Sequence, residues 1–373
     1  MGSGILRAWQ IAADFRERGI PVVLGGIAAS LLGAERCLPH ADTLVLGEAE
    51  ETWPTVIQDF MAGRLQRVYP MARRPDIATL PLPRYDLLDG SKLGLWRPVQ
   101  ATRGCPFTCD YCSITAFFQA RYRKRPVDQV IRDVRAAKRS GSRYIAFIDD
   151  NIGVDWKYCA ELWEALIPER IIWISQCSLH IADRPDMLKL ARRSGCRLLS
   201  FGIESTSPES LAIHDKAWNR PGRYGAAVRT IRAHGIDVST EMIIGMDGDD
   251  PTVFQRTFDF LIENEISVPR IHILTPIPGT PLFERLRAEG RIVSEDLRLY
   301  SGGRVTFRPR QLDPETLQAE YWRLYERLFS WRGIAARVAR NPARLGPYMR
   351  AFIFAVNMHY RNHVHHRICP GIV

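Results

Sequence analysis

A repeated alternation of strand-like and helix-like segments, beginning near Pro98, most constrains how this chain can fold. Each unit pairs a short apolar run with a longer segment whose apolar residues recur at helical spacing. Six such units in succession predict parallel strands, buried on both faces, in a sheet that curls toward a barrel. The predicted strands are Val99–Thr102, Tyr144–Ile148, Ile171–Cys177, Arg197–Ile203, Val238–Ile244 and Arg270–Leu274. The predicted helices are Val127–Lys138, Trp156–Leu166, Met187–Arg193, Tyr224–His234, Val253–Glu263 and Leu282–Ala288.

The first 68 residues predict a smaller α/β segment before this repeat. Ile5–Arg18 has helical apolar spacing, Ile20–Gly26 is an apolar strand that ends in a glycine turn, and Thr43–Leu46 is a second strand. This order is typical of an open parallel sheet, but the segment is too short for a complete doubly wound domain. We therefore interpret residues 1–68 as the remnant of a Rossmann-like domain.

Two further segments flank the predicted barrel, which spans residues 96–295. Residues 69–95 are rich in proline and lack an apolar period, which predicts an extended linker. Residues 296–373 predict a helical C-terminal region, with helices over Pro314–Phe329 and Pro342–Arg361. The predicted fold class is α/β: a partial (β/α)6 TIM-like barrel after a truncated Rossmann-like segment and before a helical region.

Charge and cysteine usage limit the classes of protein that this chain can be. The formal net charge is +10, but arginine is spread along the chain, so we expect a basic surface and no nucleic-acid partner. Five of the eight cysteines are scattered, which is not the layout of a secreted disulfide scaffold. With no signal peptide and no apolar run long enough to span a bilayer, we expect a cytoplasmic protein.

The other three cysteines are clustered as Cys105, Cys109 and Cys112. Thiolates at this C-x3-C-x2-C spacing can wrap around one [4Fe–4S] cluster. Three ligands for four irons leave one iron open, which is a catalytic arrangement and not merely one for electron transfer. A zinc site would need a fourth cysteine or histidine in a matching pair, and none is near in sequence. The alternatives to an iron–sulfur cluster are a zinc site and an accidental grouping of three cysteines, and we expect the cluster.

With Tyr111 before the last cysteine, residues 101–112 at the end of the first predicted strand resemble the radical SAM superfamily. The resemblance implies that S-adenosylmethionine (SAM) chelates the open iron. It also implies that one electron cleaves the C–S bond of SAM to give a 5′-deoxyadenosyl radical. Tyr111 matches the family's aromatic position near the adenine, although a core tyrosine explains it equally well.

Polar residues follow the predicted strands, where a barrel of this type collects its functional groups. The resemblance implies that Asp149, Asp150 and Asn151 meet the amino group of SAM. It further implies that Ser178 and Glu204 lie near the ribose and methionine moiety, and that Gly245 lies near the adenine. The alternative for each residue is an ordinary turn or helix cap.

A narrower resemblance concerns the segments on either side of the barrel. Residues 22–26, 46–54 and 81–85 resemble the end of a cobalamin-binding domain joined to a radical SAM barrel. Residues 275–282, 289–292 and 305–309 resemble the group that includes hopanoid C-2 methylases.

This resemblance implies that the turn at Gly25 and Gly26 approaches the nucleotide tail of cobalamin. The Asp-x-His-x-x-Gly loop that begins such a domain is absent from this sequence. The chain is therefore a fragment, a mis-started gene product or a form that has lost cobalamin, and cobalamin binding stays open.

The leading hypothesis is a radical SAM enzyme that transfers a methyl group to an unactivated carbon of a small-molecule or lipid-like substrate. The alternatives are cobalamin-independent C–H functionalisation by the same radical chemistry and a non-catalytic remnant that binds a cluster. We expect a reductant such as flavodoxin or ferredoxin as partner.

The tail has arginines among aromatic residues, which indicates either peripheral membrane contact or helices packed over the barrel. The spacing of four histidines near Cys369 defines no set of metal ligands, so we expect no metal site there.

Overall fold

The computed structural model describes residues 2–87, 94–339 and 345–371. Packing divides the chain into two compact units. The smaller unit comprises Met1–Leu80, Phe107–Arg121 and Thr275–Arg308. The larger unit comprises Pro81–Pro106, Tyr122–Leu274 and Pro309–Val373. This division by packing does not test the four segments expected from the sequence, which stay a prediction.

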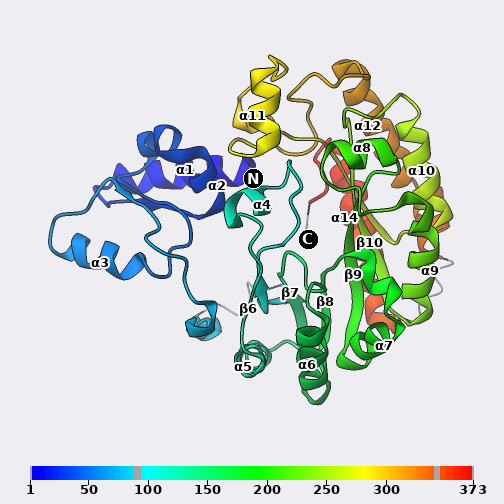
Figure 1. The fold of residues 1–373 in the computed structure, drawn as a ribbon, viewed down its shortest axis with the longest axis horizontal. Coiled ribbons are helices and arrows are strands. Elements are labelled where there is room, and N and C mark those ends of the chain that lie inside the picture. The colour runs from blue at the N-terminus through cyan, green and yellow to red at the C-terminus, as the bar shows by residue number, and fades with distance from the viewer. Residues whose placement is uncertain (1, 88–93, 340–344, 372–373) are drawn as a thin grey trace. The chain divides into compact units, whose positions relative to one another are not determined.

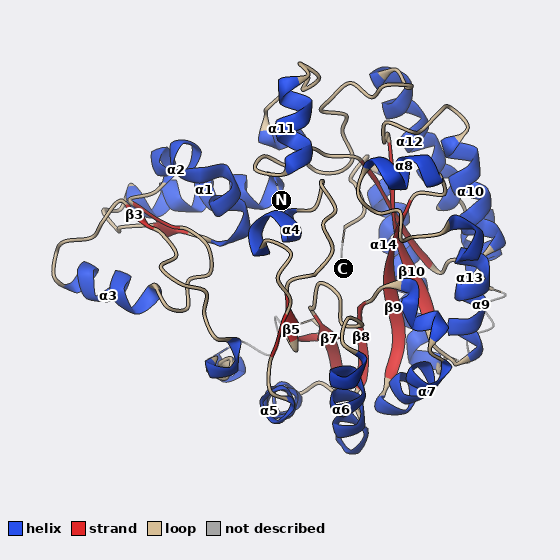
Figure 2. Ribbon diagram, in the orientation of Figure 1, coloured by secondary structure: helices blue, strands red, loops and turns tan. Residues whose placement is uncertain are grey.

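The larger unit is built around a six-stranded sheet in which all neighbouring strands run parallel. Its order is β11-β10-β9-β8-β7-β4, so the strands follow one another along the chain from one edge to the other. Their bounds are β4 (Arg97–Val99), β7 (Tyr144–Phe147), β8 (Ile172–Gln176), β9 (Cys196–Glu204), β10 (Asp237–Ile244) and β11 (Val268–Ile273). This topology confirms the predicted partial (β/α)6 barrel (Figure 2).

Helices follow the strands along the outer side of this sheet (Figure 1). They are α5 (Val127–Arg139), α6 (Trp156–Leu166), α7 (Pro185–Ser194), α8 (Pro208–Ile213), α9 (Tyr224–Ala233) and α10 (Val253–Glu263). The sequence predicts all of them except α8, which is too short to show a period. Gly195 ends α7 with a φ of 111°, and a Cβ there would lie 2.1 Å from the carbonyl oxygen of Ile171. Only glycine therefore permits this tight return into β9.

The two faces of the sheet differ in burial. On the outer face, Ile145, Trp173 and Leu199 are fully buried, and the ring of Trp173 lies 5.8 Å from that of Trp163 in α6. Side chains that alternate with these are partly exposed on the opposite face, which we call the inner face. They are Ala146, Ile174, Gln176, Glu241 and His272. The partly exposed side chains make the inner face the side from which a substrate can reach the strands.

The first strand of the sheet is shorter than the sequence predicts. We expected Val99–Thr102, whereas β4 ends at Val99 and Thr102 begins β5 (Thr102–Arg103). β5 pairs antiparallel with β6 (Arg123–Lys124) in a separate two-stranded sheet. The ladder breaks at Ala101 because a buried carboxylate, that of Asp149, takes up the backbone amides there.

Three helices complete the larger unit: α12 (Pro314–Leu328), α13 (Trp331–Val338) and α14 (Pro347–His365). α12 packs against α10, and α14 packs against β11, as expected for helices over the barrel. α13 was not predicted, because it is short and contains Gly333. Residues 340–344, where the second tail helix was expected to begin, lie outside the described residues. Among the described residues, no helix is both long and apolar enough to cross a membrane.

The smaller unit holds a three-stranded parallel sheet of order β1-β2-β3. Its elements are α1 (Gly2–Arg16), β1 (Val23–Leu24), α2 (Gly26–Cys37), β2 (Thr43–Val45), α3 (Trp53–Met61), β3 (Val68–Tyr69), α4 (Ser113–Phe118) and α11 (Pro281–Ala288). Leu24, Leu44 and Phe283 meet in its core. The sequence predicts β1 and β2 but not β3, whose two residues are too few to show a strand period.

Candidate active site

The segment that carries the three cysteines is closed at its base by the β5–β6 pair, where Arg103 lies opposite Arg123. Gly104 has a φ of 84° and directly precedes Cys105. Cys105 belongs to the larger unit, whereas Cys109 and Cys112 belong to the smaller unit. Cys109 is buried, while Cys105 and Cys112 are partly exposed.

Two carboxylates that follow β7 hold the backbone on the N-terminal side of Cys105. Asp149 is buried and accepts hydrogen bonds from the amide of Ala101 (3.2 Å) and from the amide and hydroxyl of Thr102. Asp150 accepts one from the amide of Gly104 (2.9 Å). Burial raises the pKa of Asp149 to about 7, against the opposing effect of these hydrogen bonds, and burial also raises the pKa of Asp150.

Both oxygens of Asp149 are therefore engaged by the chain itself. This gives Asp149 a positioning role for the cysteine segment that the sequence did not indicate, while its expected contact with SAM stays a prediction.

The ends of β7 and β8 are joined by Asn151 and Ser178. The side-chain oxygen of Asn151 accepts hydrogen bonds from the amides of Ser178 (3.1 Å) and Gly153 (3.3 Å). Asn151 and Ser178 are both buried. The structure thus brings these two predicted residues together, as parallel strand ends should, but the bond uses the backbone of Ser178 and not its hydroxyl.

Glu204 ends β9 in the left-handed backbone region, with a φ of 65°. Its carboxylate lies 2.5 Å from the ammonium of Lys216, and both side chains are buried. Asn219 donates hydrogen bonds to the carbonyl oxygens of Gly202 (2.9 Å) and Ile203 (3.2 Å). A non-glycine residue is held in this conformation only when its surroundings impose it, and such residues are common at binding sites.

Gly245 follows β10 with a φ of 87°, and a Cβ there would lie 2.7 Å from Leu317 of α12. The amides of Gly245 (2.9 Å) and Met246 (3.0 Å) donate to one oxygen of Asp249. The other oxygen of Asp249 accepts from the hydroxyl of Ser210, and burial raises the pKa of Asp249 to about 6. Gly245 is therefore required by a tight turn, and its expected place near the adenine stays a prediction.

The smaller unit anchors the second half of the cysteine segment to α11. The carbonyl oxygen of Asp110 accepts a hydrogen bond from the amide of Leu282 (3.1 Å), and its buried carboxylate lies 2.9 Å from the guanidinium of Arg285. The amide of Cys112 donates to the carbonyl oxygen of Cys109 (3.1 Å), which shapes the turn between them. Tyr111 is half-buried in this turn.

The donor set of the segment fits a [4Fe–4S] cluster chemically. Cysteine sulfurs are the ligands that such clusters take, and the carboxylate within the motif, that of Asp110, is paired with Arg285. Among residues 2–87, 94–339 and 345–371, no three His, Cys, Asp or Glu side chains are gathered as a ready metal site. Coordination by Cys105, Cys109 and Cys112 therefore stays a prediction about the loaded protein.

The two glycines expected to approach cobalamin lie where β1 meets α2 in the smaller unit. Gly26 has a φ of 87°, and a Cβ on Gly26 would meet no atom within 4 Å. A Cβ on Gly25 would lie 3.4 Å from the carbonyl oxygen of Val45. The turn is therefore open on the side of Gly26, while the expected contact with cobalamin stays a prediction.

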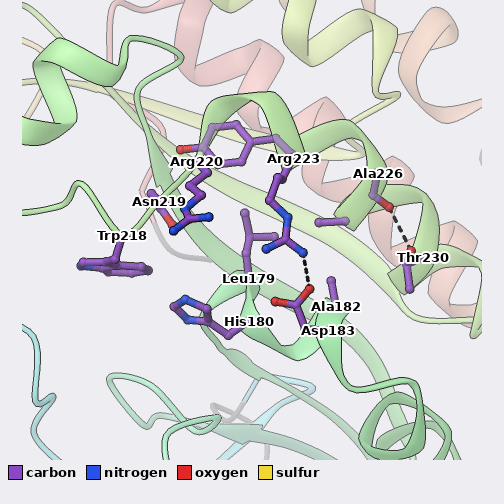
Figure 3. A pocket seen from close by; sticks show the side chains of 12 residues that line it. Leu179, His180, Ala182, Asp183, Trp218, Asn219, Arg220, Arg223, Ala226 and Thr230 are labelled. Carbon is purple, nitrogen blue, oxygen red and sulfur yellow. Dashed lines mark hydrogen bonds and ion pairs between the residues drawn. The ribbon is translucent and has the colours of Figure 1, made fainter.

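A pocket of about 380 Å³ lies in the larger unit, between segments that follow β8 and β9 (Figure 3). Its lining includes the polar and aromatic side chains of His180, Asp183, Trp218, Asn219, Arg220 and Arg223. The rings of His180 and Trp218 stack with centroids 5.4 Å apart. Neither Ser178 nor Glu204 lines this pocket, so it is distinct from the residues expected near SAM.

Polar side chains on the inner face of the sheet were missed by the sequence analysis. Arg270 of β11 pairs with Glu241 of β10 and donates to the hydroxyl of Ser200 in β9 (2.8 Å). His272 lies 3.3 Å from the second carboxylate oxygen of Glu241. The sequence did contain a signal for these residues, because charged residues interrupt the mainly apolar or small residues of β10 and β11.

Comparison with known proteins places the chain in a family. The sequence model of the radical SAM superfamily matches residues 99–261, and a domain of unknown function (DUF4070) matches residues 280–362. The chain is 31% identical over 342 residues to bacteriochlorophyllide d C-12(1)-methyltransferase of Chlorobaculum tepidum, covering 90% of this chain and 74% of that protein. It is 30% identical over 290 residues to hopanoid C-2 methylase of Rhodopseudomonas palustris, covering 75% and 54% respectively.

The fold is also similar to that of a solved radical SAM methyltransferase, TsrM of Kitasatospora setae with cobalamin and a [4Fe–4S] cluster bound. The TM-score is 0.63 at 17% identity, covering 98% of this chain and 76% of that one. The chain belongs to the radical SAM superfamily. It is an enzyme of this superfamily, and its cofactors are a [4Fe–4S] cluster and SAM.

Proposed function

We propose that this chain is a radical SAM methyltransferase that methylates an unactivated carbon of a small-molecule or lipid-like substrate. The observation that carries the proposal is the C-x3-C-x2-C segment at the end of the first strand of a parallel barrel, in a chain 31% identical to a named methyltransferase. Relatives named for a bacteriochlorophyllide and a hopanoid support the substrate class. When bound, the cluster and SAM supply a 5′-deoxyadenosyl radical, which can remove hydrogen from an unreactive C–H bond.

The roles of individual residues follow from their places in the fold. Cys105, Cys109 and Cys112 would hold three irons. Asp149 holds Ala101 and Thr102, and Asp150 holds Gly104, so the approach to Cys105 has a defined backbone.

Tyr111 and the polar residues at the other strand ends would bind SAM. Asp149, Asp150 and Asn151 would meet its amino group, Ser178 and Glu204 its ribose and methionine moiety, and Tyr111 and Gly245 its adenine.

Anaerobic reconstitution with iron and sulfide tests the proposal. The wild-type chain should take up about four irons and, with SAM and a strong reductant, release 5′-deoxyadenosine. The triple variant C105A/C109A/C112A should do neither. A matched control, C37A/C159A/C196A, alters three scattered buried cysteines and should keep both properties. A wild-type chain without cluster, or a cluster that survives in the triple variant, would refute the assignment.

Whether the purified chain retains cobalamin decides how the methyl group is carried. The open glycine turn at Gly26 supports cobalamin binding by the smaller unit. A purified chain that retains no cobalamin would favour cobalamin-independent C–H functionalisation. Purification in the presence of hydroxocobalamin, followed by the visible absorption spectrum of the washed protein, distinguishes the two. A G26V variant should lose retained cobalamin if the turn forms the contact, and unchanged retention would place the vitamin elsewhere.

The partners and location of the enzyme are also proposals. The scattered placing of five of the eight cysteines supports a reducing cytoplasm, and a net charge of +10 favours an acidic one-electron donor such as flavodoxin or ferredoxin. Exposed Trp331, Tyr348 and Phe354 on the last helices support peripheral membrane contact. Sedimentation with anionic vesicles should fall when these three aromatics are replaced by serine, and unchanged binding would exclude this surface.

A further inference from the structure

Cys369, His272 and Glu241 form a continuous polar set in the larger unit, apart from the strand-end residues described above. The sulfur of Cys369 lies 3.5 Å from Nδ1 of His272, and Nε2 of His272 lies 3.3 Å from the carboxylate of Glu241. Glu241 and His272 stand on neighbouring strands and share the inner face of the sheet. The segment after α14 brings Cys369 to this face.

Neighbouring elements hold the set in place. The hydroxyl of Tyr321 in α12 donates a hydrogen bond to the sulfur of Cys369 (3.2 Å). Arg270 pairs with the other oxygen of Glu241. On the C-terminal side, the hydroxyl of Tyr360 in α14 donates to the carbonyl oxygen of Gly371. Tyr325 of α12 is the remaining titratable group that faces this set, and its hydroxyl bonds the backbone of Ile271.

The geometry does not suit a metal ion. The two ring nitrogens of His272 point to opposite sides, one toward sulfur and one toward carboxylate, so the three groups share no common point. It is instead a thiol, an imidazole and a carboxylate in line, the arrangement that activates a cysteine nucleophile.

The contacts of His272 with Cys369 and Glu241 favour the positively charged form of its imidazole. Burial opposes this charge, but the hydrogen bonds to Cys369 and Glu241 outweigh burial and raise the pKa of His272 to about 10. A cation on one side of the sulfur and the donating hydroxyl of Tyr321 on another both stabilise negative charge on that atom.

The scattered cysteines are different. Cys159, Cys177 and Cys196 are buried, and burial raises the pKa of each thiol well above its ordinary value. Cys369 is partly exposed.

We propose that Cys369 is a reactive thiol of this chain, positioned beside the imidazole of His272, which Glu241 orients, and that its sulfur attacks an electrophilic carbon on the inner face of the sheet. The sulfur forms a bond to that carbon, and the leaving group departs with the electron pair of the broken bond. The thiol proton passes to the solvent, so no oxidant or reductant is consumed. The ligand class is therefore a soft carbon electrophile.

Alkylation of the anaerobic, cluster-loaded full chain by iodoacetamide tests this, with peptide mass spectrometry reporting each cysteine. Cys369 should react before Cys159, Cys177 and Cys196. In H272Q the rate at pH 6.5 should fall about tenfold, because the imidazole beside the sulfur is lost. H234Q, at the partly exposed histidine that directly follows α9, should behave as wild type.

Equal rates at Cys369 in wild type and H272Q, or a rate no faster than that of Cys196, would overturn the proposal. Circular dichroism establishes that H272Q is folded. If it is not, Y321F keeps the imidazole and removes a donor to sulfur, and its alkylation at pH 6.5 should slow about threefold. An unchanged rate in a folded Y321F would also count against the proposal. Neither outcome depends on SAM cleavage, so the test is independent of the methyltransferase proposal.

Discussion

Two chemically reactive regions of this protein are built in opposite ways. The cysteine segment gathers Cys105, Cys109 and Cys112 within eight consecutive residues. The inner-face set gathers Glu241, His272 and Cys369 from two strands and the end of the chain. A contiguous motif needs the fold only to hold its backbone, whereas a dispersed set exists only when the fold is formed. We therefore expect substitutions in the dispersed set to cost far more folding stability than substitutions of the cysteines themselves.

The largest effect on stability is expected for E241Q. Removal of this negative charge leaves Arg270 and the His272 ring side by side, with only partial access to water. Breaking such a pair should lower the free energy of unfolding by about 2–4 kcal/mol, measured by denaturant titration of the cluster-free chain at pH 7. The control E320Q breaks a surface pair with Arg323 and should cost less than about 0.5 kcal/mol. Equal losses in the two variants would contradict the comparison.

The next effect concerns Asp149, which supports the cysteine segment. Its pKa is raised to about 7 in the folded state, so the neutral form is favoured on folding. Its contribution to stability is full below the unfolded pKa of about 3.9 and is lost as pH rises through 7. Between pH 5 and 8 the wild type should lose on the order of 1–3 kcal/mol relative to D149N.

The measurement for Asp149 is denaturant unfolding at both pH values. Asp249, whose pKa burial raises to about 6, contributes to both proteins and so cancels in the comparison. D14N, at an exposed position of α1, is the control and should follow the wild type. A pH dependence that is the same in D149N and wild type would show that Asp149 is charged throughout.

A smaller effect is expected for R285Q in the smaller unit. The guanidinium of Arg285 is partly exposed, so loss of its pair with Asp110 should cost about 1 kcal/mol or less. Because Asp110 lies between two of the cysteines, iron release to a chelator should nonetheless become severalfold faster, and R285K should restore part of the difference. R287Q breaks a surface pair on the same helix and should release iron as the wild type does. Identical rates of iron release from R285Q and R287Q would show that Arg285 does not support the cysteine segment.

The smallest effect on stability is expected for the triple variant C105A/C109A/C112A. Before iron is added, its free energy of unfolding should differ from that of the wild type by less than about 1 kcal/mol, because two of the thiols are partly exposed. A larger loss, measured on the cluster-free chains, would mean that the thiols themselves support the fold and would remove the contrast with Glu241.

Much of the fold could be predicted from periodicity. The six parallel strands and the helices between them were found because buried parallel strands are short apolar runs and helices repeat every three to four residues. Elements with too few residues for a period were missed, as β3, α8 and α13 show. The end of β4 was misplaced because Ala101 leaves the ladder for a carboxylate 48 residues later in the chain.

The cysteine motif and the strand ends were predictable for a related reason. A contiguous spacing is visible in any conformation, and polar residues after strands must meet at one edge of a parallel sheet. Asn151 and Ser178 do meet there. What these groups bind stays a prediction, since the structure describes only the contacts that they make with the chain itself.

By itself the sequence determined a parallel barrel, a three-thiol segment at the end of its first strand and polar groups at the strand ends that follow. Only the tertiary structure decided that Asp149 holds the backbone before Cys105, that Asp110 is tied to Arg285, and that His272 lies between Glu241 and Cys369. The physical reason is range. Periodicity and motif spacing are local properties of the chain, whereas an ion pair or hydrogen bond across the fold depends on which strands become neighbours.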